Sequence, residues 1–350
     1  MEKRNGLASF LRRDSDITRM LLVTLLIFAS MASIRPAQFL RSNNFISMGF
    51  QIPELGFYSI AMMMVMVTGG RDLSIVGIGN LACIIAALIM HDGFTQGLTG
   101  AAMYANIAFG VVAAMGVGIL CGLINGIIVA YTGIASMLVT MATSYIFTGI
   151  GIVITRGEAF SKVFPEFVHL GNNTLMGLPI PLWLLIIALI ATAILLNKTK
   201  YGFELKMVGS NPLASHFTGI NNKLVLIKTY LYSGIMCAIC GLEILARTDT
   251  AKADYAFTYT FQAILCAVLG ATSPSGGFAK VSCLALSLIS MQLLSSGFNL
   301  LCLGGYFKEF AWGLLLLLVL SINFLADLYR RKRSLAMVSR RSKMLESKAL

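Results

Sequence analysis

Three acidic residues, Glu54, Asp72 and Glu243, lie within or beside long apolar runs of this 350-residue chain. A carboxylate in apolar surroundings is costly, so each one needs a partner, a route to the surface or a function. Snorkelling to the surface is open to both glutamates and is favoured for Glu243. Asp72 is expected to accept backbone N–H groups at the start of the next helix, with Ser74 assisting, and contact with a transported solute is the alternative.

Uncharged amides occupy similar positions, inside or beside apolar runs. They are Asn80, Asn125, Gln262, Gln292 and Asn299. Such groups can hydrogen bond to a polar solute that crosses the apolar region, or to neighbouring helices, and the residues alone leave both explanations open.

The sequence contains no motif typical of ATP hydrolysis, of a metal site or of nucleophilic catalysis. The chain has no phosphate-binding Gly-Lys-Ser/Thr loop, no His-Glu-x-x-His run and no nucleophile elbow. The pair Cys237 and Cys240 has redox-motif spacing but falls inside an apolar run without a second Cys or His cluster, so it indicates packing. We therefore expect no enzyme activity, no cofactor and no metal.

The composition predicts that lipid surrounds most of this chain. It is 57% hydrophobic and 12% charged, whereas soluble domains carry about 25% charged residues. A helix needs about 20 apolar residues to cross a membrane. The apolar runs of this chain therefore predict an all-α polytopic protein with about ten spans, some short or broken. The expected limits are 20–34, 44–68, 74–91, 102–131, 134–155, 181–197, 226–246, 258–272, 278–298 and 306–328.

Basic residues set the expected orientation. With a cytoplasmic N-terminus, 20 of the 27 Lys and Arg residues fall inside the cell, as the positive-inside rule requires. The net charge of +12 is thus a topology signal rather than a nucleic-acid surface. The expected parts are a cytoplasmic tail (1–19), a permease domain (20–328) and a basic cytoplasmic tail (329–350) that contacts lipid headgroups.

A polar loop at 198–228 interrupts the apolar pattern at its expected cytoplasmic face. Within it, the segment 209–220 can form one short helix, which Asn211 and Pro212 begin and Gly219 ends. Leu213, His216 and Phe217 would form its docking face. An ordinary surface helix is the alternative, but long polar loops in membrane proteins usually contact something outside the membrane.

Two glycine-rich interruptions predict broken helices, one in each half of the chain. The expected hinge residues are Gly69, Gly70, Gly270, Gly276 and Gly277. Paired breaks of this kind point to a transport pathway between the halves. A separate stripe of Gly118, Gly122 and Gly126 predicts a close helix contact, either within the chain or with a second subunit.

Five segments in order carry a family resemblance, which runs from about Phe39 to Phe324. They are Gly-Gly-Arg-Asp-Leu-Ser (69–74), Gly-Leu-Ile-Asn-Gly (122–126), 209–220, 270–277 and Ser-Gly-Phe-Asn-Leu-Leu-Cys-Leu (296–303). The chain resembles the permease subunits of bacterial ABC importers for simple sugars, the group of the ribose, xylose and galactose permeases. It departs from the family pattern at Arg71, at Pro212-Leu213 and at Ala135-Ser136.

The resemblance implies a subunit of the bacterial inner membrane that forms the path for a simple sugar. Its implied partners are a cytoplasmic ABC ATPase, which hydrolyses the ATP, an external sugar-binding protein, and a second permease copy or paralogue. The segment 209–220 would be the coupling helix for the ATPase. Candidates for the translocation path are Asp72, Ser74, Asn80, Asn125, Gln262 and Asn299.

Other functions remain open at this point. A permease for nucleosides or branched-chain amino acids shares the broken-helix pattern. An ion-coupled secondary transporter would use Glu54, Asp72 and Glu243 as a coupling site, but would leave the long polar loop without a role. The external segments 156–179 and 247–255 are expected to form a platform for the binding protein.

Overall fold

The computed structural model describes residues 15–321, nearly all of which lie in helices or in short connections between them. Most of the expected N-terminal tail, the end of the last expected span (322–328) and the basic tail 329–350 lie outside the described residues. The first helix begins at Ser15, five residues earlier than the expected span.

The elements follow one another with few long loops. The helices are α2 Ser15–Ile34, α3 Pro36–Phe39, α4 Ser42–Val67, α5 Ile75–Thr95, α6 Gly100–Thr132, α7 Ser136–Thr155, α8 Pro165–Asn172, α9 Ile180–Lys198, α10 Lys200–Ser210, α11 Pro212–Phe217, α12 Asn222–Thr248, α13 Tyr259–Leu269 and α14 Val281–Leu300. Residues 305–321 are also helical. Four two-residue strands complete the fold: β1 Phe160–Ser161, β2 Thr174–Leu175, β3 Leu178–Pro179 and β4 Thr250–Ala251.

Eight helices between residues 15 and 321 are long and apolar enough to cross a membrane. The expected span at 258–272 is a helix of only 11 residues, α13, and the expected tenth span corresponds to the helix at 305–321. The chain is an all-α polytopic membrane protein, as its sequence predicts.

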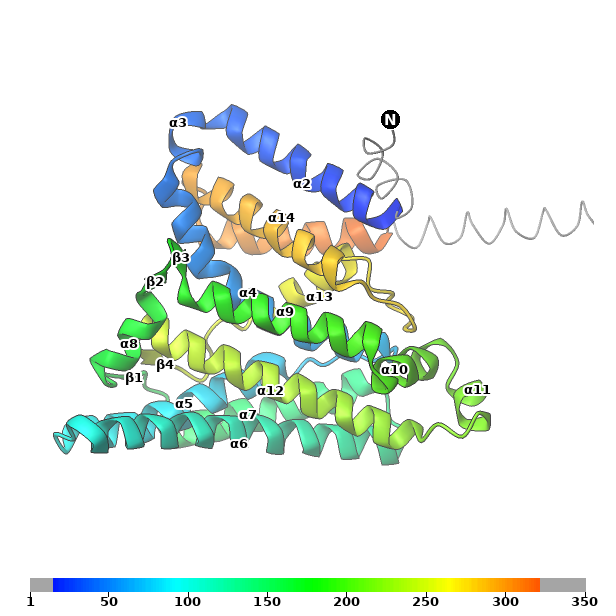
Figure 1. Cartoon of the computed structure of the whole chain (residues 1–350), viewed down its shortest axis with the longest axis horizontal. Helices are drawn as coiled ribbons and strands as arrows, with labels where there is room; N and C mark the ends of the chain where they lie inside the picture. The colour runs from blue at the N-terminus through cyan, green and yellow to red at the C-terminus, as the bar shows by residue number, and fades with distance from the viewer. Residues whose placement is uncertain (1–14, 322–350) are drawn as a thin grey trace, which may run out of the picture.

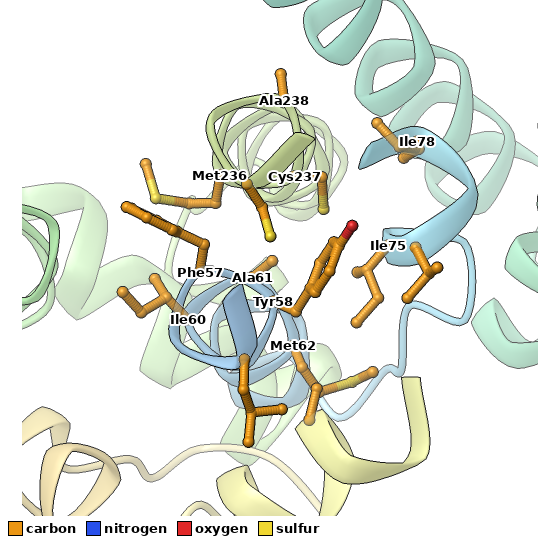
Figure 2. Packing of buried hydrophobic residues seen from close by; sticks show 14 of the residues in the cluster. Phe57, Tyr58, Ile60, Ala61, Met62, Ile75, Ile78, Met236, Cys237 and Ala238 are labelled. Carbon is orange, nitrogen blue, oxygen red and sulfur yellow. The ribbon is translucent and has the colours of Figure 1, made fainter. Parts of the chain in front are cut away.

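Helix α4 lies at the centre of the bundle and is buried on nearly every side. It packs against α12 and α13, and α12 also covers α5 and α6. Figure 2 shows Phe57, Tyr58 and Ala61 of α4 directed toward Met236 and Cys237 of α12. Methionine fills irregular gaps well because its side chain is unbranched and flexible. The buried Met62, Met63, Met64 and Met66 let α4 contact several neighbours at once.

Among residues 15–321, α6 and α12 make the most extensive contact of any helix pair. A Cβ at Gly122 would contact the carbonyl oxygen of Tyr230 at 2.5 Å, and one at Gly126 would contact the Cα of Ile227 at 2.9 Å. Because no side chain separates the backbones, the two helices approach each other closely. The glycine stripe of α6 therefore makes a contact within this chain.

The bundle has two ends with different structures (Figure 1). One end, called here the α8 end, carries α3, α8 and both small sheets. The opposite end, the α11 end, carries α10, α11 and the segment 270–280 that links α13 to α14. The sheets are antiparallel pairs, β1 with β4 and β2 with β3.

Candidate functional site

Helix α11 starts at the residues expected from the sequence. The Asn211 side chain accepts hydrogen bonds from the backbone N–H groups of Leu213 (3.1 Å) and Ala214 (3.0 Å), and Pro212 occupies the first helical position. Gly219 follows the helix with a φ of 83°, a left-handed conformation that favours glycine. Capping of this kind fixes a six-residue helix that would be marginal alone.

The α11 surface is apolar and open. Leu213 is 67% exposed and Phe217 is 80% exposed, and His216 is exposed beside them with its ring 6.2 Å from the Phe217 ring. Large apolar side chains gathered on a projecting helix indicate a docking surface, because water contact with them is unfavourable.

The polar loop forms two helices rather than the single one expected. Helix α10 precedes α11 and packs on α9, α12 and α4. The side chain of Thr199 caps its start by accepting from the backbone N–H of Gly202. The Tyr201 hydroxyl lies 2.8 Å from the Thr229 hydroxyl of α12, and burial raises the pKa of Tyr201 to about 12, so this phenol stays neutral. Helix α11 is thus mounted on an element that is fixed to the bundle.

Gly209 places the last turn of α10 directly on both helix breaks. A Cβ at Gly209 would collide with the carbonyl oxygen of Val67 and the backbone nitrogen of Gly277, two groups that are hydrogen bonded to each other at 2.8 Å. A Cβ at Gly276 would meet the carbonyl oxygen of Gly209 and the backbone nitrogen of Gly69, each at 2.7 Å. We call Gly69, Gly209, Gly276 and Gly277 the glycine junction.

The expected hinge glycines differ in conformation. Positive φ values occur at Gly69 (85°), Gly276 (88°) and Gly277 (81°). Gly70 and Gly270 do not adopt positive φ values. A Cβ at Gly270 would meet the backbone of Leu284 at 2.7 Å, so Gly270 allows α13 and α14 to approach. Two of the five glycines therefore serve close contact rather than a left-handed turn.

Asp72 is buried and its carboxylate is fully engaged. One oxygen accepts from the Ser74 hydroxyl (2.6 Å) and backbone N–H (3.0 Å), and the other accepts from the Ser233 hydroxyl of α12 (2.8 Å). Asn125 of α6 donates to the Ser74 hydroxyl at 2.7 Å. These contacts tie the start of α5 to α6 and α12, as the structural explanation of Asp72 predicts.

Asn80 also binds protein groups. Its amide donates to the carbonyl oxygens of Ala253 (3.0 Å) and Tyr255 (2.9 Å) and so holds the segment after β4 against α5. The α8 end is attached to α12 in the same way, because the Asn172 amide donates to the carbonyl oxygens of Ala246 (3.2 Å) and Arg247 (3.1 Å).

Two of the expected path residues, Gln262 and Asn299, meet in one cavity of about 280 Å³. Its lining also includes Gln292, whose amide donates to the Gln51 side-chain oxygen at 2.9 Å. The other lining residues are Leu55, Tyr259, Met291, Ser295, Gly305, Lys308, Glu309 and Trp312. We call this the amide cavity. Asp72, Ser74, Asn80 and Asn125 do not line it.

The amide cavity lies between α4, α13, α14 and helix 305–321. Each of these helices contributes residues from its half nearer the α8 end. Gln51 stands in the first half of α4, Tyr259 and Gln262 in the first turn of α13, and Asn299 at the end of α14. The opposite ends of α4 and α14 meet the glycine junction and the segment 270–280. The cavity thus extends from the side of the α8 end to the middle of the bundle, away from α11.

Glu54 and Glu243 do not reach the surface, which corrects the expectation of snorkelling. They are 1% and 5% exposed. Arg247 of α12 forms an ion pair with Glu54 and lies 4.0 Å from Glu243, and the Tyr259 hydroxyl donates to Glu54 at 3.0 Å. A buried carboxylate is tolerated when a paired cation and hydrogen bonds replace its water. We call Glu54, Glu243 and Arg247 the buried charge cluster.

Several residues of the amide cavity and of the buried charge cluster could not be predicted from local sequence patterns. Gln51 lies in the first half of α4, Tyr259 begins α13 and Trp312 lies in the helix 305–321, and local patterns do not connect these positions. Arg247 lies on α12 rather than in the external segment that the sequence predicts. Its place on α12, one helical turn after Glu243, is the pattern that could have revealed the ion pair. Within residues 15–321, no group of three or more His, Cys, Asp or Glu side chains could hold a metal ion.

Comparison with known proteins identifies the chain. The family described as "Branched-chain amino acid transport system / permease component" matches residues 44–322. The chain belongs to this family. It is therefore a permease component of a transport system, and the breaks, the cavity and α11 all lie within the matched range.

Individual relatives of this chain are permease proteins named for the compounds that their systems transport. The ribose import permease protein RbsC of Escherichia coli (strain K12) is 26% identical over 306 residues, which cover 86% of this chain and 92% of the relative. The L-arabinose transport system permease protein AraH of the same strain is 28% identical over 313 residues, 89% and 90% of the two chains.

A third relative extends the group beyond pentoses. The autoinducer 2 import system permease protein LsrD of Photorhabdus temperata is 26% identical over 299 residues, 84% of this chain and 86% of the relative. No solved structure gave a significant match. The expected resemblance to importer permeases is confirmed.

Proposed function

We propose that this permease forms the translocation path of an ATP-binding-cassette importer for a simple sugar. The projecting apolar surface of α11 carries the proposal, because an exposed Leu213 and Phe217 on a firmly mounted helix need a partner. That partner is a cytoplasmic ATPase, and α11 transmits its movement. The uncharged amides of the amide cavity suit a neutral, hydroxyl-rich solute.

The α11 end faces the cytoplasm in this proposal and the α8 end faces outward, in the bacterial inner membrane. Five lysines lie within or close to α10 and α11, and this concentration of positive charge is typical of a cytoplasmic loop. They are Lys198, Lys200, Lys206, Lys223 and Lys228. The termini are then cytoplasmic as well. Helix α8 and the small sheets form the surface where an external binding protein delivers the sugar.

A second permease subunit, either an identical copy or a paralogue, completes the transporter in this proposal. Helices α6 and α7 support it, because they expose many large apolar side chains to a neighbouring helix or to lipid.

An ion-coupled transporter is the weaker alternative. Its coupling site would need ionisable groups within the membrane that bind and release an ion. Asp72 instead accepts three hydrogen bonds from serines, and Glu54 is bound to Arg247 and Tyr259. Both carboxylates are thus occupied by structural partners, and α11 would have no role in such a mechanism.

Uptake into sealed vesicles separates the two mechanisms. Vesicles containing the permease, its ATPase and its binding protein should accumulate labelled D-ribose or L-arabinose when ATP reaches the ATPase. Ionophores that collapse proton and sodium gradients should leave the rate unchanged. Accumulation that follows an ion gradient and ignores ATP would refute the proposal.

A further inference from the structure

The amide cavity has room for one small solute. Its volume of about 280 Å³ lies just below the ~300–1,000 Å³ range of ligand pockets. A monosaccharide is of suitable size, whereas an oligosaccharide is too large. Trp312 adds an apolar ring to the polar lining, and ligand sites commonly combine aromatic surface with a few oriented polar groups.

The amides of the cavity retain both hydrogen-bond donors and a hydrogen-bond acceptor that a ligand can use. The bond from Gln292 to Gln51 uses one N–H and one carbonyl oxygen, which leaves the Gln51 NH₂ group as a donor and the Gln292 oxygen as an acceptor. Lys308 donates to the Asn299 side-chain oxygen, so the Asn299 NH₂ group is also left as a donor. A sugar hydroxyl both donates and accepts, and it can use either kind of group.

Charge in the lining is balanced. Lys308 and Glu309 contribute one charge of each sign, and the remaining polar lining residues are uncharged. A charged ligand would find no net counter-charge in the cavity, so a neutral solute is favoured.

Tyr259 differs from the amides because its hydroxyl proton, the only one that its side chain can donate, already forms a hydrogen bond. The hydroxyl donates to Glu54 at 3.0 Å, and Arg247 holds that carboxylate in place. Toward any further partner, the Tyr259 oxygen can therefore only accept. A ligand that places a hydroxyl against it must donate.

We propose that the amide cavity binds one uncharged, polyhydroxylated molecule of monosaccharide size, and that Tyr259 determines specificity by accepting a hydrogen bond from one ligand hydroxyl. This site rests on the proposed function above and names the place where the sugar enters the permease from the α8 end.

Trp312 provides a direct test, because the chain has only two tryptophans. In a Trp183→Phe background, full-length permease in lipid nanodiscs reports through Trp312 alone. Titration with D-ribose and with L-arabinose should change the Trp312 emission in a saturable way for at least one of them. Asn299→Ala and Gln262→Ala should each raise the half-saturation concentration about fivefold to tenfold, the effect of losing one hydrogen bond.

Asn197→Ala is the matched control. Asn197 also accepts from a lysine, Lys206, at 3.0 Å, but it lies at the α11 end, outside the cavity. It should leave the half-saturation concentration unchanged. Absence of any saturable change in Trp312 emission, or equal half-saturation in all variants, would overturn the proposal.

Deoxy sugars test the role of Tyr259. Tyr259→Phe should raise the half-saturation concentration several-fold for the parent sugar but have no effect with the one deoxy analogue that lacks the donating hydroxyl. An equal rise of the half-saturation concentration with every analogue would show that Tyr259 has only a structural role, and would overturn that part of the proposal. If ATP drives uptake but the cavity variants bind and transport sugar normally, the proposed binding site is refuted and the proposed transport function stands. If the Trp312 emission responds to sugar but ATP drives no uptake, the proposed transport function is refuted.

Discussion

Gly209→Ala is expected to prevent accumulation of folded permease or to abolish uptake. Its new methyl group would collide with two backbone atoms, the Val67 oxygen and the Gly277 nitrogen. Backbone atoms cannot move aside as flexible side chains do, so the end of α10 must shift. Overpacking a close contact costs ~1–3 kcal/mol or more, and here the shift also opens the hydrogen bond that joins the end of α4 to the second break.

Size-exclusion chromatography of solubilised protein and ATP-driven uptake measure the effect of Gly209→Ala. Gly116→Ala is the control, because a Cβ at Gly116 in α6 meets no atom within 4 Å, and alanine favours a helix over glycine by about 0.8–1.0 kcal/mol. Normal folding and uptake by the Gly209→Ala variant would show that the glycine junction is not tightly packed.

Arg247→Ala is the second change with a large expected effect. It leaves Glu54 and Glu243 buried together without a counter-charge. Removing one partner of a buried ion pair typically costs about 3–5 kcal/mol. We expect a clear drop in the thermal unfolding midpoint of the solubilised permease, together with loss of uptake, because Glu54 also holds Tyr259 at the amide cavity.

Two further variants separate charge from shape at the buried charge cluster. Glu243→Gln should change the midpoint little, because neither Glu243 carboxylate oxygen has a hydrogen-bond partner among the described residues. Combining Glu54→Gln and Glu243→Gln with Arg247→Met removes every charge of the buried charge cluster and should recover most of the stability lost in Arg247→Ala, since neutral replacements of buried charged groups are often tolerated. An Arg247→Ala midpoint equal to that of the unsubstituted protein would contradict this account.

Features set by neighbouring residues could be predicted from the sequence. Asn211, Pro212 and Gly219 define α11 because capping and left-handed turns depend on adjacent residues. The helix breaks were found for the same reason, since glycine-rich interruptions of apolar runs are visible locally. Asp72 is expected to accept backbone N–H groups at the start of the next helix, and it accepts the backbone N–H of Ser74, two residues away.

Features that join distant parts of the chain were missed. Glu54 and Arg247 are 193 residues apart in sequence, so nothing local shows that they pair, and from the sequence snorkelling is open to Glu54 and favoured for Glu243. The amide cavity draws residues from four helices, and only packing reveals that Gln262 and Asn299 face one space while Asn80 and Asn125 bind other groups. Helix α10 was not predicted as a separate helix because packing against α4 and α9, rather than a local sequence pattern, holds it in place.

ATP-driven transport by this permease requires α11 to be a cytoplasmic docking surface for the ATPase. Phe217→Cys places a thiol on α11, and Met176→Cys, at a residue 89% exposed at the α8 end, is its counterpart. Cys302→Ser removes the exposed native thiol among the seven cysteines.

The decisive measurement is labelling with a membrane-impermeant maleimide. In inside-out vesicles the Phe217→Cys thiol should react and Met176→Cys should not, and in right-side-out vesicles the order should reverse. Binding of the partner ATPase should protect Phe217→Cys. Labelling of Phe217→Cys from outside the cell, or equal labelling with and without the ATPase, would contradict the account.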